Sequence, residues 1–512
     1  MRLARLTLAA ALVLLAVPSL AHARDFPRDF LWGTAISGFQ TEAGGKPDNG
    51  DRRSDWWAWT RDRANIERGW VSGDRVERGP GHWRLYRRDA RLARRRLGVN
   101  AFRFGVEWSR IFPRSTEGAT TLRQLDKLAD RAAVGHYRRE LRAIRRLGMT
   151  PVVTLSHFSL PLWIHDPIAA RDAFAGVGPD DPTPRGFGPR GWLDRRTVRE
   201  FRKYAAYLAW KYGDLVDLWA PLNEPVVVAT SGYVNVPGAF AGYFPPGAYS
   251  FPAAVATVRH QALAQSVAYD AIHRHDRRAK VGPVHNMIAF TPSNPASAAD
   301  RRGARHADYI FNRLFLNAVV RGVDDRNVNG RIEPGERSRR LKDSADFVGL
   351  NYYFRGRVTG LPAPASSTVG LFDFLPTFSY RTPQNPGAAP CPSTCTDFGW
   401  EIYPRGFRRV LGIAGSYRLP VYVTENGLAD AGDDRRRSYL LAHLRALQDA
   451  RRDGAARVKG YFAWSLMDNF EWAAGYYPRF GFFGYDPDTL RRTERPSART
   501  FRRIARSGTL PR

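Results

Sequence analysis

Eight short apolar segments, separated by longer stretches with helical periodicity, constrain the fold of this chain most strongly. They lie at residues 30–37 (FLWGTAIS), 101–108 (AFRFGVEW), 151–158 (PVVTLSHF), 218–224 (LWAPLNE), 281–287 (VGPVHNM), 346–353 (DFVGLNYY), 421–427 (VYVTENG) and 459–468 (KGYFAWSLMD). Strands that alternate with helices are typical of a parallel α/β fold. Because eight such units close a barrel, the sequence predicts a (β/α)₈ TIM barrel with long loops over its C-terminal face.

Length and composition are compatible with one such domain. The chain has 512 residues, of which 43% are hydrophobic and 12% aromatic, which is too apolar for a disordered chain. A barrel with insertions can exceed ~400 residues in one unit. Segments rich in Gly, Pro and aromatic residues, at about 232–250 and 360–399, are predicted to be irregular loops. We therefore predict a single (β/α)₈ domain over residues 24–512.

The first 23 residues have the pattern of a signal peptide. Arg2 and Arg5 precede an apolar stretch at 6–17, and Ala21-His22-Ala23 forms a small-x-small cleavage site. The sequence predicts a secreted or extracytoplasmic protein, with a retained anchor helix as the alternative. No later segment approaches ~18 consecutive apolar residues, so we predict no transmembrane segment.

The strong positive charge does not by itself identify a partner. Formal net charge is +30, with 79 Lys and Arg residues against 49 Asp and Glu residues. The basic residues are spread along helix-like segments such as 94–96 and 145–146, which favours solvated helix faces. No nucleic-acid-binding motif is present, so we predict no nucleic-acid partner.

The two cysteines, Cys391 and Cys395, lie close together in the segment CPSTC. A zinc site would need further Cys or His residues at ligand spacing, and none is nearby. In an exported protein a disulfide that closes a small loop is expected, and two free thiols are the alternative.

Polar residues gather at the C-terminal ends of the predicted strands, where a barrel carries its chemistry. Glu224 ends the fourth segment and Glu425 the seventh. Cleavage of a glycosidic bond with retention needs two carboxyl groups about 5 to 5.5 Å apart, one to protonate the leaving oxygen and one to attack the anomeric carbon. A barrel can bring these two glutamates together across its mouth. A surface or ion-paired role is the alternative for either glutamate alone.

Longer motifs surround these positions. They are, in chain order, FLWGTAISGFQTEA, LGVNAFRFGVEWSRIFP, PVVTLSHFSLP, LNEP, DFVGLNYY, YVTENG and GYFAWSLMDNFEWAAGYYPRFGFFGYD. On these motifs the chain resembles glycoside hydrolase family 1, and it looks closest to the archaeal-type broad-specificity β-glycosidases. The resemblance implies a retaining β-glycosidase that hydrolyses terminal β-D-glucosides, galactosides or short β-oligosaccharides through a covalent glycosyl-enzyme. A transglycosylase and a non-catalytic sugar-binding barrel are the alternatives.

The resemblance also implies roles for single residues. Glu224 would be the general acid/base and Glu425 the nucleophile, with Arg103, Asn351 and Tyr353 in support. The residues expected to bind substrate are Gln40, His157, Asn223, Tyr353, Trp400, Trp464, Glu471 and Trp472. Catalysis would need no metal or cofactor, the partner would be a small-molecule β-glycoside, and the oligomeric state stays open.

Two positions bear on the sugar. Glu471 is a carboxylate where relatives that hydrolyse 6-phosphorylated sugars have another residue, so an unphosphorylated glycone is expected because a carboxylate repels phosphate. The family commonly has His-Trp where this chain has His157-Phe158. The missing indole N–H removes one donor to a ring hydroxyl and leaves the identity of the glycone open.

The segment DRNVNGRIEPGE matches the spacing of a calcium-binding loop, D-x-[DN]-x-[DN]-G-x₅-E. Its candidate ligands are Asp325, Asn327, Asn329, Arg331, Glu333 and Glu336, and the turn glycine is Gly330. The sequence predicts a structural Ca²⁺ site here, with a polar turn before the sixth strand as the alternative.

Overall fold

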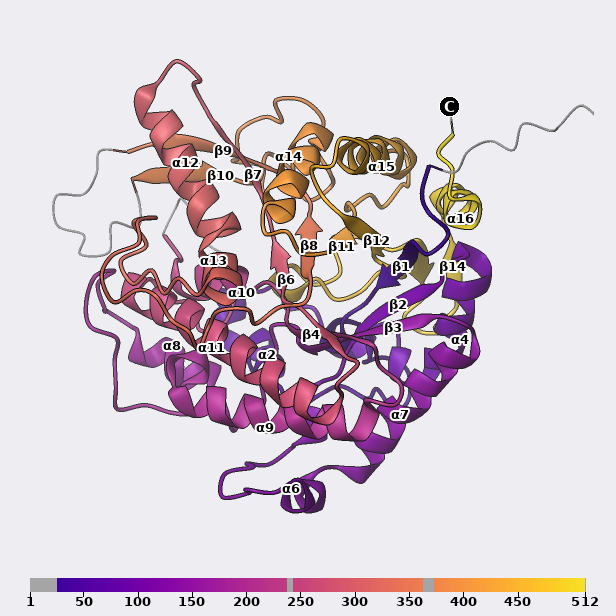
Figure 1. Ribbon diagram of the computed structural model, residues 1–512, viewed down its shortest axis with the longest axis horizontal. Coiled ribbons are helices and arrows are strands. Elements are labelled where there is room, and N and C mark those ends of the chain that lie inside the picture. The colour runs from indigo at the N-terminus through magenta and orange to yellow at the C-terminus, as the bar shows by residue number, and fades with distance from the viewer. Residues whose placement is uncertain (1–24, 237–242, 362–372, 512) are drawn as a thin grey trace, which may run out of the picture.

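A barrel of eight parallel strands forms the centre of the molecule (Figure 1). The computed structural model describes residues 25–236, 243–361 and 373–511. The barrel strands are β1 (Leu31–Ala35), β2 (Ala101–Gly105), β3 (Thr150–Ser156), β4 (Leu218–Leu222), a divided fifth strand made of β5 (Lys280–Val281) and β6 (Val284–Asn286), β8 (Val348–Tyr352), β11 (Val421–Asn426) and β12 (Val458–Trp464). Each predicted segment overlaps one of these strands, and the predicted (β/α)₈ fold is confirmed.

The strands pair around the barrel in chain order, and β1 pairs with β12. In the divided fifth strand, β5 pairs with β4 while β6 pairs with β8. A bridge between Asn223 and Val284 continues β4 onto β6, and the Glu224 N–H donates to the Val284 carbonyl at 2.8 Å. The barrel therefore closes directly beside Glu224.

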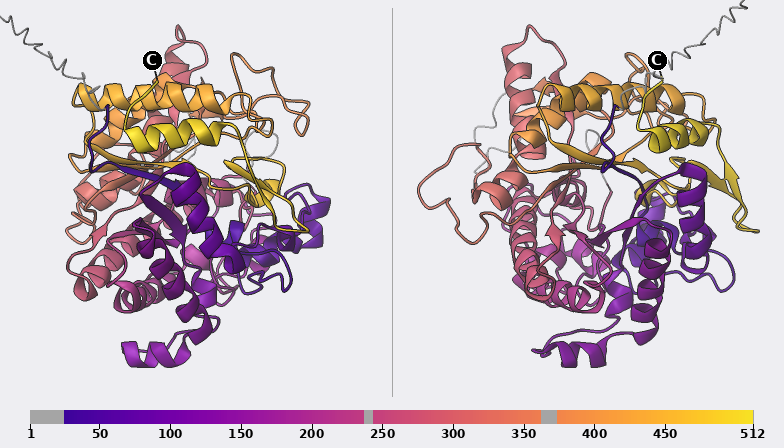
Figure 2. Two further views of the ribbon diagram at one scale, coloured as in Figure 1. Left: turned by 90° about the vertical axis from the view of Figure 1, so that its right-hand side faces the viewer. Right: turned by 45° about the vertical axis from the view of Figure 1, so that its right-hand side comes forward.

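Helices form a layer around the barrel (Figures 1 and 2). The longer ones are α4 (His82–Leu92), α7 (Arg131–Arg146), α9 (Arg195–Tyr212), α11 (Phe251–His275), α12 (Ala298–Asn312), α13 (Leu314–Arg321), α14 (Pro404–Gly415), α15 (Arg436–Arg452) and α16 (Ser497–Ser507). Shorter ones lie in the connections: α1 (Gly38–Thr41), α2 (Asp55–Arg61), α3 (Arg63–Glu67), α5 (Trp108–Ile111), α6 (Leu122–Leu128), α8 (Pro167–Ala173) and α10 (Pro225–Tyr233).

Helix α7 shows why such segments become helical. The Asp130 carboxylate caps its N-terminus by accepting the N–H groups of Ala132 and Ala133, which would otherwise lack partners. Leu141 and Ile144 repeat at helical spacing and are fully buried. The opposite face carries arginines, as the sequence predicts.

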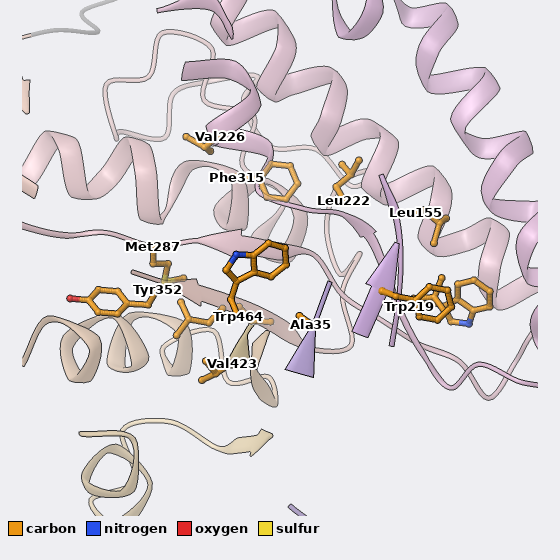
Figure 3. Close-up of a cluster of buried hydrophobic side chains, with 14 of the residues drawn as sticks. Ala35, Leu155, Trp219, Leu222, Val226, Met287, Phe315, Tyr352, Val423 and Trp464 are labelled. Carbon is orange, nitrogen blue, oxygen red and sulfur yellow. The ribbon is translucent and has the colours of Figure 1, made fainter. Parts of the chain in front are cut away.

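The core fills the space between the strands and the helices. Figure 3 shows part of one cluster of buried side chains, which includes Leu155, Trp219, Leu222 and Val423 of the barrel strands and Phe315 of α13. All five residues of β2 are buried, as expected for parallel strands that are covered on both faces. This packing gives the polar strand ends a rigid base.

Smaller sheets lie outside the barrel. Strand β9 (Arg355–Gly360) pairs in parallel with β7 (Ala289–Pro292) and antiparallel with β10 (Phe374–Thr377), and β13 (Phe483–Tyr485) pairs with β14 (Arg492–Glu494). The prediction of an irregular loop over 360–399 was therefore wrong at β10. Pro376 argues against a strand in the sequence pattern, but a strand at the edge of a sheet can contain a proline.

The basic side chains lie largely at the surface and form ion pairs. Two arginines of α7, Arg138 and Arg145, contact Asp214 at 2.5 Å and Asp217 at 2.6 Å. This supports the interpretation of solvated helix faces. Within the three described ranges, no helix is long and apolar enough to cross a membrane. The predicted signal peptide lies outside the described residues.

The two cysteines form a disulfide in the structure, with their Cα atoms 6.1 Å apart. It closes a short loop between β10 and α14. Of the two alternatives drawn from the sequence, this is the loop-closing bond.

Candidate active site

A cavity of about 480 Å³ opens at the C-terminal ends of the barrel strands. Glu224 and Glu425 both line it. So do most of the predicted substrate-binding residues, namely His157, Asn223, Tyr353, Trp400, Trp464, Glu471 and Trp472. The structure thus brings together side chains from five barrel strands and the loops that follow them.

Glu224 occupies the junction between β4 and α10. Its backbone is left-handed, with φ of 51°, a conformation that costs energy in a residue other than glycine. The following Pro225 begins α10 and disfavours the right-handed helical conformation at Glu224. The hydrogen bond to Val284 holds this conformation in place. The carboxyl group accepts from Asn351 Nδ2 at 2.5 Å and from Asn286 Nδ2 at 3.3 Å.

The environment of Glu224 favours its protonated form. Burial, followed by the nearby charge of Glu425, raises its pKa to about 8. The hydrogen bonds from Asn351 and Asn286 and the charge of Arg103 oppose this rise. Glu224 therefore carries a proton at neutral pH, as a general acid must.

Glu425, on β11, lies against a buried cation. Arg103 of β2 forms an ion pair with its Oε1 atom, and the Tyr353 hydroxyl donates to Oε2. Burial and the Glu425 charge raise the pKa of Tyr353 well above its usual value, so the phenol stays a donor. These two contacts stabilise the ionised carboxylate.

Arg103 also orders the residues around the two glutamates. Its Nη2 atom donates to Asn223 Oδ1 at 2.7 Å, and its Nε atom donates to Thr154 Oγ1 at 3.1 Å. Asn351 Nδ2 donates to the same Asn223 oxygen at 3.2 Å as well as to Glu224. One network thus joins the two carboxyl groups through residues on β2 and β8 and directly after β4. Arg103 and Asn351 lie behind the cavity and do not line it.

Polar atoms without protein partners face the other end of the site. Gln40, just outside the lining, donates through Nε2 to Glu471 Oε2 at 3.3 Å and to the Phe470 carbonyl at 3.0 Å. Within the described part of the chain, its Oε1 atom is buried without a hydrogen-bond partner, and so is Nδ1 of His157. Burial and the charge of Arg103 lower the pKa of His157 well below its usual value, so the imidazole is neutral. These atoms are suited to accept or donate bonds to ligand hydroxyls.

Glu471 is a third carboxyl group in the cavity. Burial raises its pKa to about 8, and the charges of Glu425 and Glu224 add to the rise. Like Glu224, it is protonated at neutral pH in the free protein.

Aromatic rings form the floor and one side of this polar end. His157 stacks between Trp464, with centroids 5.8 Å apart, and Trp472, at 6.0 Å. Phe158 contacts Trp472 edge-to-face at 5.0 Å and Phe244 at 5.1 Å. At the position where the sequence lacks an indole, the ring therefore offers packing and no donor.

The outer part of the cavity is apolar. Its wall on the side of Trp400 consists of Ile288, Phe311, Phe354, Phe378, Phe398 and Phe480. Trp400 lies in this wall against Phe354, with centroids 4.8 Å apart. It also contacts the ring of Tyr353, with centroids 5.5 Å apart.

Sequence reasoning missed two polar residues of this region. Asn286 ends the fifth strand and contacts Glu224; its place at a strand end was the signal that could have identified it. Glu107 lies behind the site, where its carboxyl group accepts from the Phe39 N–H at 2.9 Å and from the Ser159 hydroxyl at 2.5 Å. These contacts join the segments that carry Gln40 and His157. Nothing in the local sequence pattern around Glu107 reveals this contact.

The predicted calcium loop lies outside the cavity, between α13 and β8. Asp325 and Glu336 are buried in it, whereas Asn327, Asn329, Arg331 and Glu333 lie nearer the surface. In the described part of the chain, no group of three or more His, Cys, Asp or Glu side chains is close enough together to hold a metal ion.

The chain matches known proteins over nearly its whole length. The model of the family described as glycosyl hydrolase family 1 matches residues 22–169 and 185–509. A β-galactosidase of Pyrococcus woesei is 38% identical, over 94% of this chain and 96% of its own. One of Saccharolobus solfataricus is 36% identical, over 95% and 96%. The crystal structure of the β-glycosidase from Thermosphaera aggregans superposes with a TM-score of 0.81 at 36% identity, covering 95% of this chain and 98% of that one.

Proposed function

The chain belongs to glycosyl hydrolase family 1, and we propose that Glu425 is its catalytic nucleophile and Glu224 its general acid/base. Members of this family are retaining β-glycosidases, and the protein is accordingly a glycoside hydrolase that acts on β-glucosides or β-galactosides. The proposal concerns which residue performs each step and which glycone the cavity takes.

One observation carries the assignment of roles. Arg103 and Tyr353 contact Glu425, whereas no cation of the described residues forms an ion pair with Glu224, whose pKa is raised to about 8. An ionised carboxylate can attack the anomeric carbon, and a protonated one can donate to the glycosidic oxygen as the bond to the leaving group breaks. The opposite assignment would need the proton on the carboxyl group that is paired with an arginine.

The second half-reaction reverses the proton transfer. After the leaving group departs, Glu224 is ionised and accepts a proton from the water that attacks the glycosyl–Glu425 ester. The ester bond breaks, Glu425 regains its charge beside Arg103, and the sugar leaves with its original configuration. Asn223, held by Arg103 at 2.7 Å, is placed to bond the 2-hydroxyl, whose hydrogen bonds strengthen in the transition state.

The cavity favours a neutral, unphosphorylated glycone. Gln40, His157 and Glu471 supply bonding groups for hydroxyls, and Trp464 and Trp472 supply apolar faces. None of the described residues that line the cavity is a lysine or arginine, so a phosphate group would meet carboxyl groups without a cation.

We also propose that the protein acts outside the cytoplasm. The leader pattern at residues 1–23 supports this, and so does the disulfide between Cys391 and Cys395, because such bonds persist mainly in oxidising compartments. Detection of a mature N-terminus near residue 24 in the exported fraction would test it. A full-length protein confined to the cytoplasm would contradict it.

Nucleophile rescue tests the roles of the two glutamates. In Glu425→Gly, hydrolysis of an aryl β-glucoside should fall by several orders of magnitude, and azide should restore turnover by forming an α-glycosyl azide. In the matched variant Glu224→Ala, substrates with very good leaving groups should still form the glycosyl-enzyme, and azide should give the β-glycosyl azide. Product configuration by NMR separates the two, and the reverse pattern would exchange the roles.

A further inference from the structure

The loop at residues 325–336 follows α13 and is wound by bonds from side chains to its own backbone. The first residue, Asp325, accepts the N–H of the sixth, Gly330, at 2.9 Å. Gly330 has a left-handed backbone with φ of 75°, which only glycine adopts without strain. The oxygens of Asn327 and Asn329 accept the N–H groups two residues further on. The first, third and fifth residues of the loop thus each accept, through a side-chain oxygen, a backbone N–H group that lies further along the loop.

Glu336, the twelfth residue, closes the loop. Its carboxyl group accepts the Arg326 N–H at 3.0 Å and the Glu333 N–H at 2.9 Å. The last residue therefore lies against the second, beside Asp325. Both carboxyl groups are almost fully buried, at 3% and 4% exposed.

The amide groups in the loop have a defined orientation. Glu333 accepts from Asn327 Nδ2 at 3.1 Å and from Asn329 Nδ2 at 2.8 Å. Because the nitrogens are held by this carboxylate, the oxygens are the atoms turned toward the rest of the loop. Amide oxygens, carboxylates and backbone carbonyls are the ligands that Ca²⁺ prefers.

A second observation, independent of this loop geometry, is a carboxylate oxygen without a partner. Among the residues that the structure describes, Asp325 Oδ1 is buried and has no hydrogen-bond partner, whereas Oδ2 accepts from both Gly330 and the Tyr309 hydroxyl. On one side Asp325 borders a small cavity lined mostly by aliphatic side chains. The arginine there, Arg259, donates to both oxygens of Asp324. A buried carboxyl oxygen without a partner is costly unless it gains a ligand.

We propose that the loop 325–336 binds one Ca²⁺ ion. Its ligands would be side-chain oxygens of Asp325, Asn327, Asn329 and Glu336 and the backbone carbonyl of Arg331, with Glu333 contributing through water. Two of the direct ligands, Asp325 and Glu336, are acidic side chains, and the other three are two amide oxygens and a backbone carbonyl, so the site is not a group of three or more acidic, His or Cys side chains. The carboxylates keep lone pairs beyond those that accept the N–H groups.

The position of the loop indicates a structural role. His306 of α12 donates through Nε2 to the Val328 carbonyl, 3.1 Å away, and its Nδ1 atom lies 2.9 Å from the carboxyl group of Asp373, just before β10. Helix α12 and strands β9 and β10 lie together in Figure 1, and Phe311 of α12 lines the outer cavity wall. Binding would therefore stabilise the packing behind this wall without entering the chemistry.

Titration of the full chain with calcium tests the proposal. After treatment with a chelator, calorimetry should show saturable binding of one Ca²⁺ per chain, and Tm should rise with Ca²⁺ concentration more than with Mg²⁺. Bound Tb³⁺ should luminesce on excitation of Tyr309, whose hydroxyl contacts Asp325. Asp325→Asn should weaken binding at least tenfold, while the matched control Asp343→Asn, at an exposed acid outside the ligand set, should not.

A variant that binds Ca²⁺ more tightly keeps the test valid even if Asp325→Asn fails to fold. Asn329→Asp adds a charged ligand and should bind Ca²⁺ more tightly than the natural loop, because affinity follows the number of charged ligands. Absence of saturable binding by the natural chain would overturn the proposal. So would equal weakening in Asp325→Asn and Asp343→Asn, or an Asn329→Asp variant with unchanged affinity.

Discussion

Replacement of Glu425 by glutamine should lower the pKa of Glu224. The structure gives two main causes for the raised value of about 8: burial first, and then the charge of Glu425. Glutamine keeps the shape of the side chain and removes only the second cause. Arg103 stays in place without its ion-pair partner, and its charge also favours ionised Glu224. Both changes act in the same direction.

The size of the shift follows from the separation of the two carboxyl groups. At about 5.5 Å, the distance needed for retention, two unit charges interact by about 3 kcal/mol when the effective dielectric constant is about 20. One pKa unit corresponds to about 1.4 kcal/mol, so the pKa should fall by about two units, from about 8 to about 6. Burial is the larger cause, which keeps the value above 4.5, the ordinary pKa of glutamate.

NMR of protein labelled with ¹³C at the glutamate carboxyl carbons can follow this titration, with Glu224→Gln in the same background to assign the signal. The exposed Glu67 offers a control, since Glu67→Gln removes a charge on α3 that makes no contact with the cavity. A Glu224 pKa that stays near 8 in Glu425→Gln would refute the electrostatic coupling of the pair. A fall of equal size in Glu67→Gln would refute its local origin.

Three further substitutions test other parts of the site. Glu471→Gln should raise thermal stability at pH 8 but not at pH 4. The reason is that a carboxyl group whose pKa is raised by folding contributes stability that is full below pH 4.5 and lost as the pH rises through about 8. Equal Tm differences at both pH values, measured by calorimetry, would contradict this. Glu107→Ala should raise KM for aryl β-glucosides several-fold with a smaller loss of kcat, because the segments that carry Gln40 and His157 lose a carboxyl group that both contact. Glu107→Gln should restore much of the lost activity, and a fall in kcat alone would exclude a positioning role. Phe158→Trp should increase discrimination between β-glucosides and β-galactosides by supplying an indole donor. An unchanged ratio of the kcat/KM values for the two substrates would show that the side chain at this position does not bond the ring hydroxyls.

Much of the fold follows from sequence pattern because barrel strands are short, apolar and covered on both faces. The differences arise where a local rule interrupts a strand. The predicted fifth segment is divided because Pro283 lacks an N–H group and cannot complete the ladder. The segment 459–468 leaves the sheet after Trp464, because its last residues turn into the loop that carries Glu471 and Trp472 to the cavity.

The candidate site was predicted less evenly. Residues in motifs, such as Glu224 and Glu425, were identified because their spacing along the chain is distinctive. The polar atoms of Gln40 and His157 that lack a described hydrogen-bond partner could not be predicted. Whether a buried polar atom finds a partner depends on neighbours from distant strands. The same holds for Glu107, which contacts residues 68 and 52 positions away.

The charges of the carboxyl groups around the cavity bear on whether it binds a neutral or a charged ligand. Three carboxyl groups, of Glu224, Glu425 and Glu471, share one buried space, and Arg103 is paired with only one of them. Burial raises the pKa of the other two to about 8, while it keeps His157 neutral. The free site therefore holds one ion pair, between Glu425 and Arg103, beside two carboxyl groups whose pKa is raised. In the proposed mechanism, a neutral sugar leaves this balance undisturbed until the transition state, when positive charge develops beside Glu425 and the proton leaves Glu224. A protonated amine that mimics that charge should consequently bind more tightly than the uncharged sugar of the same shape.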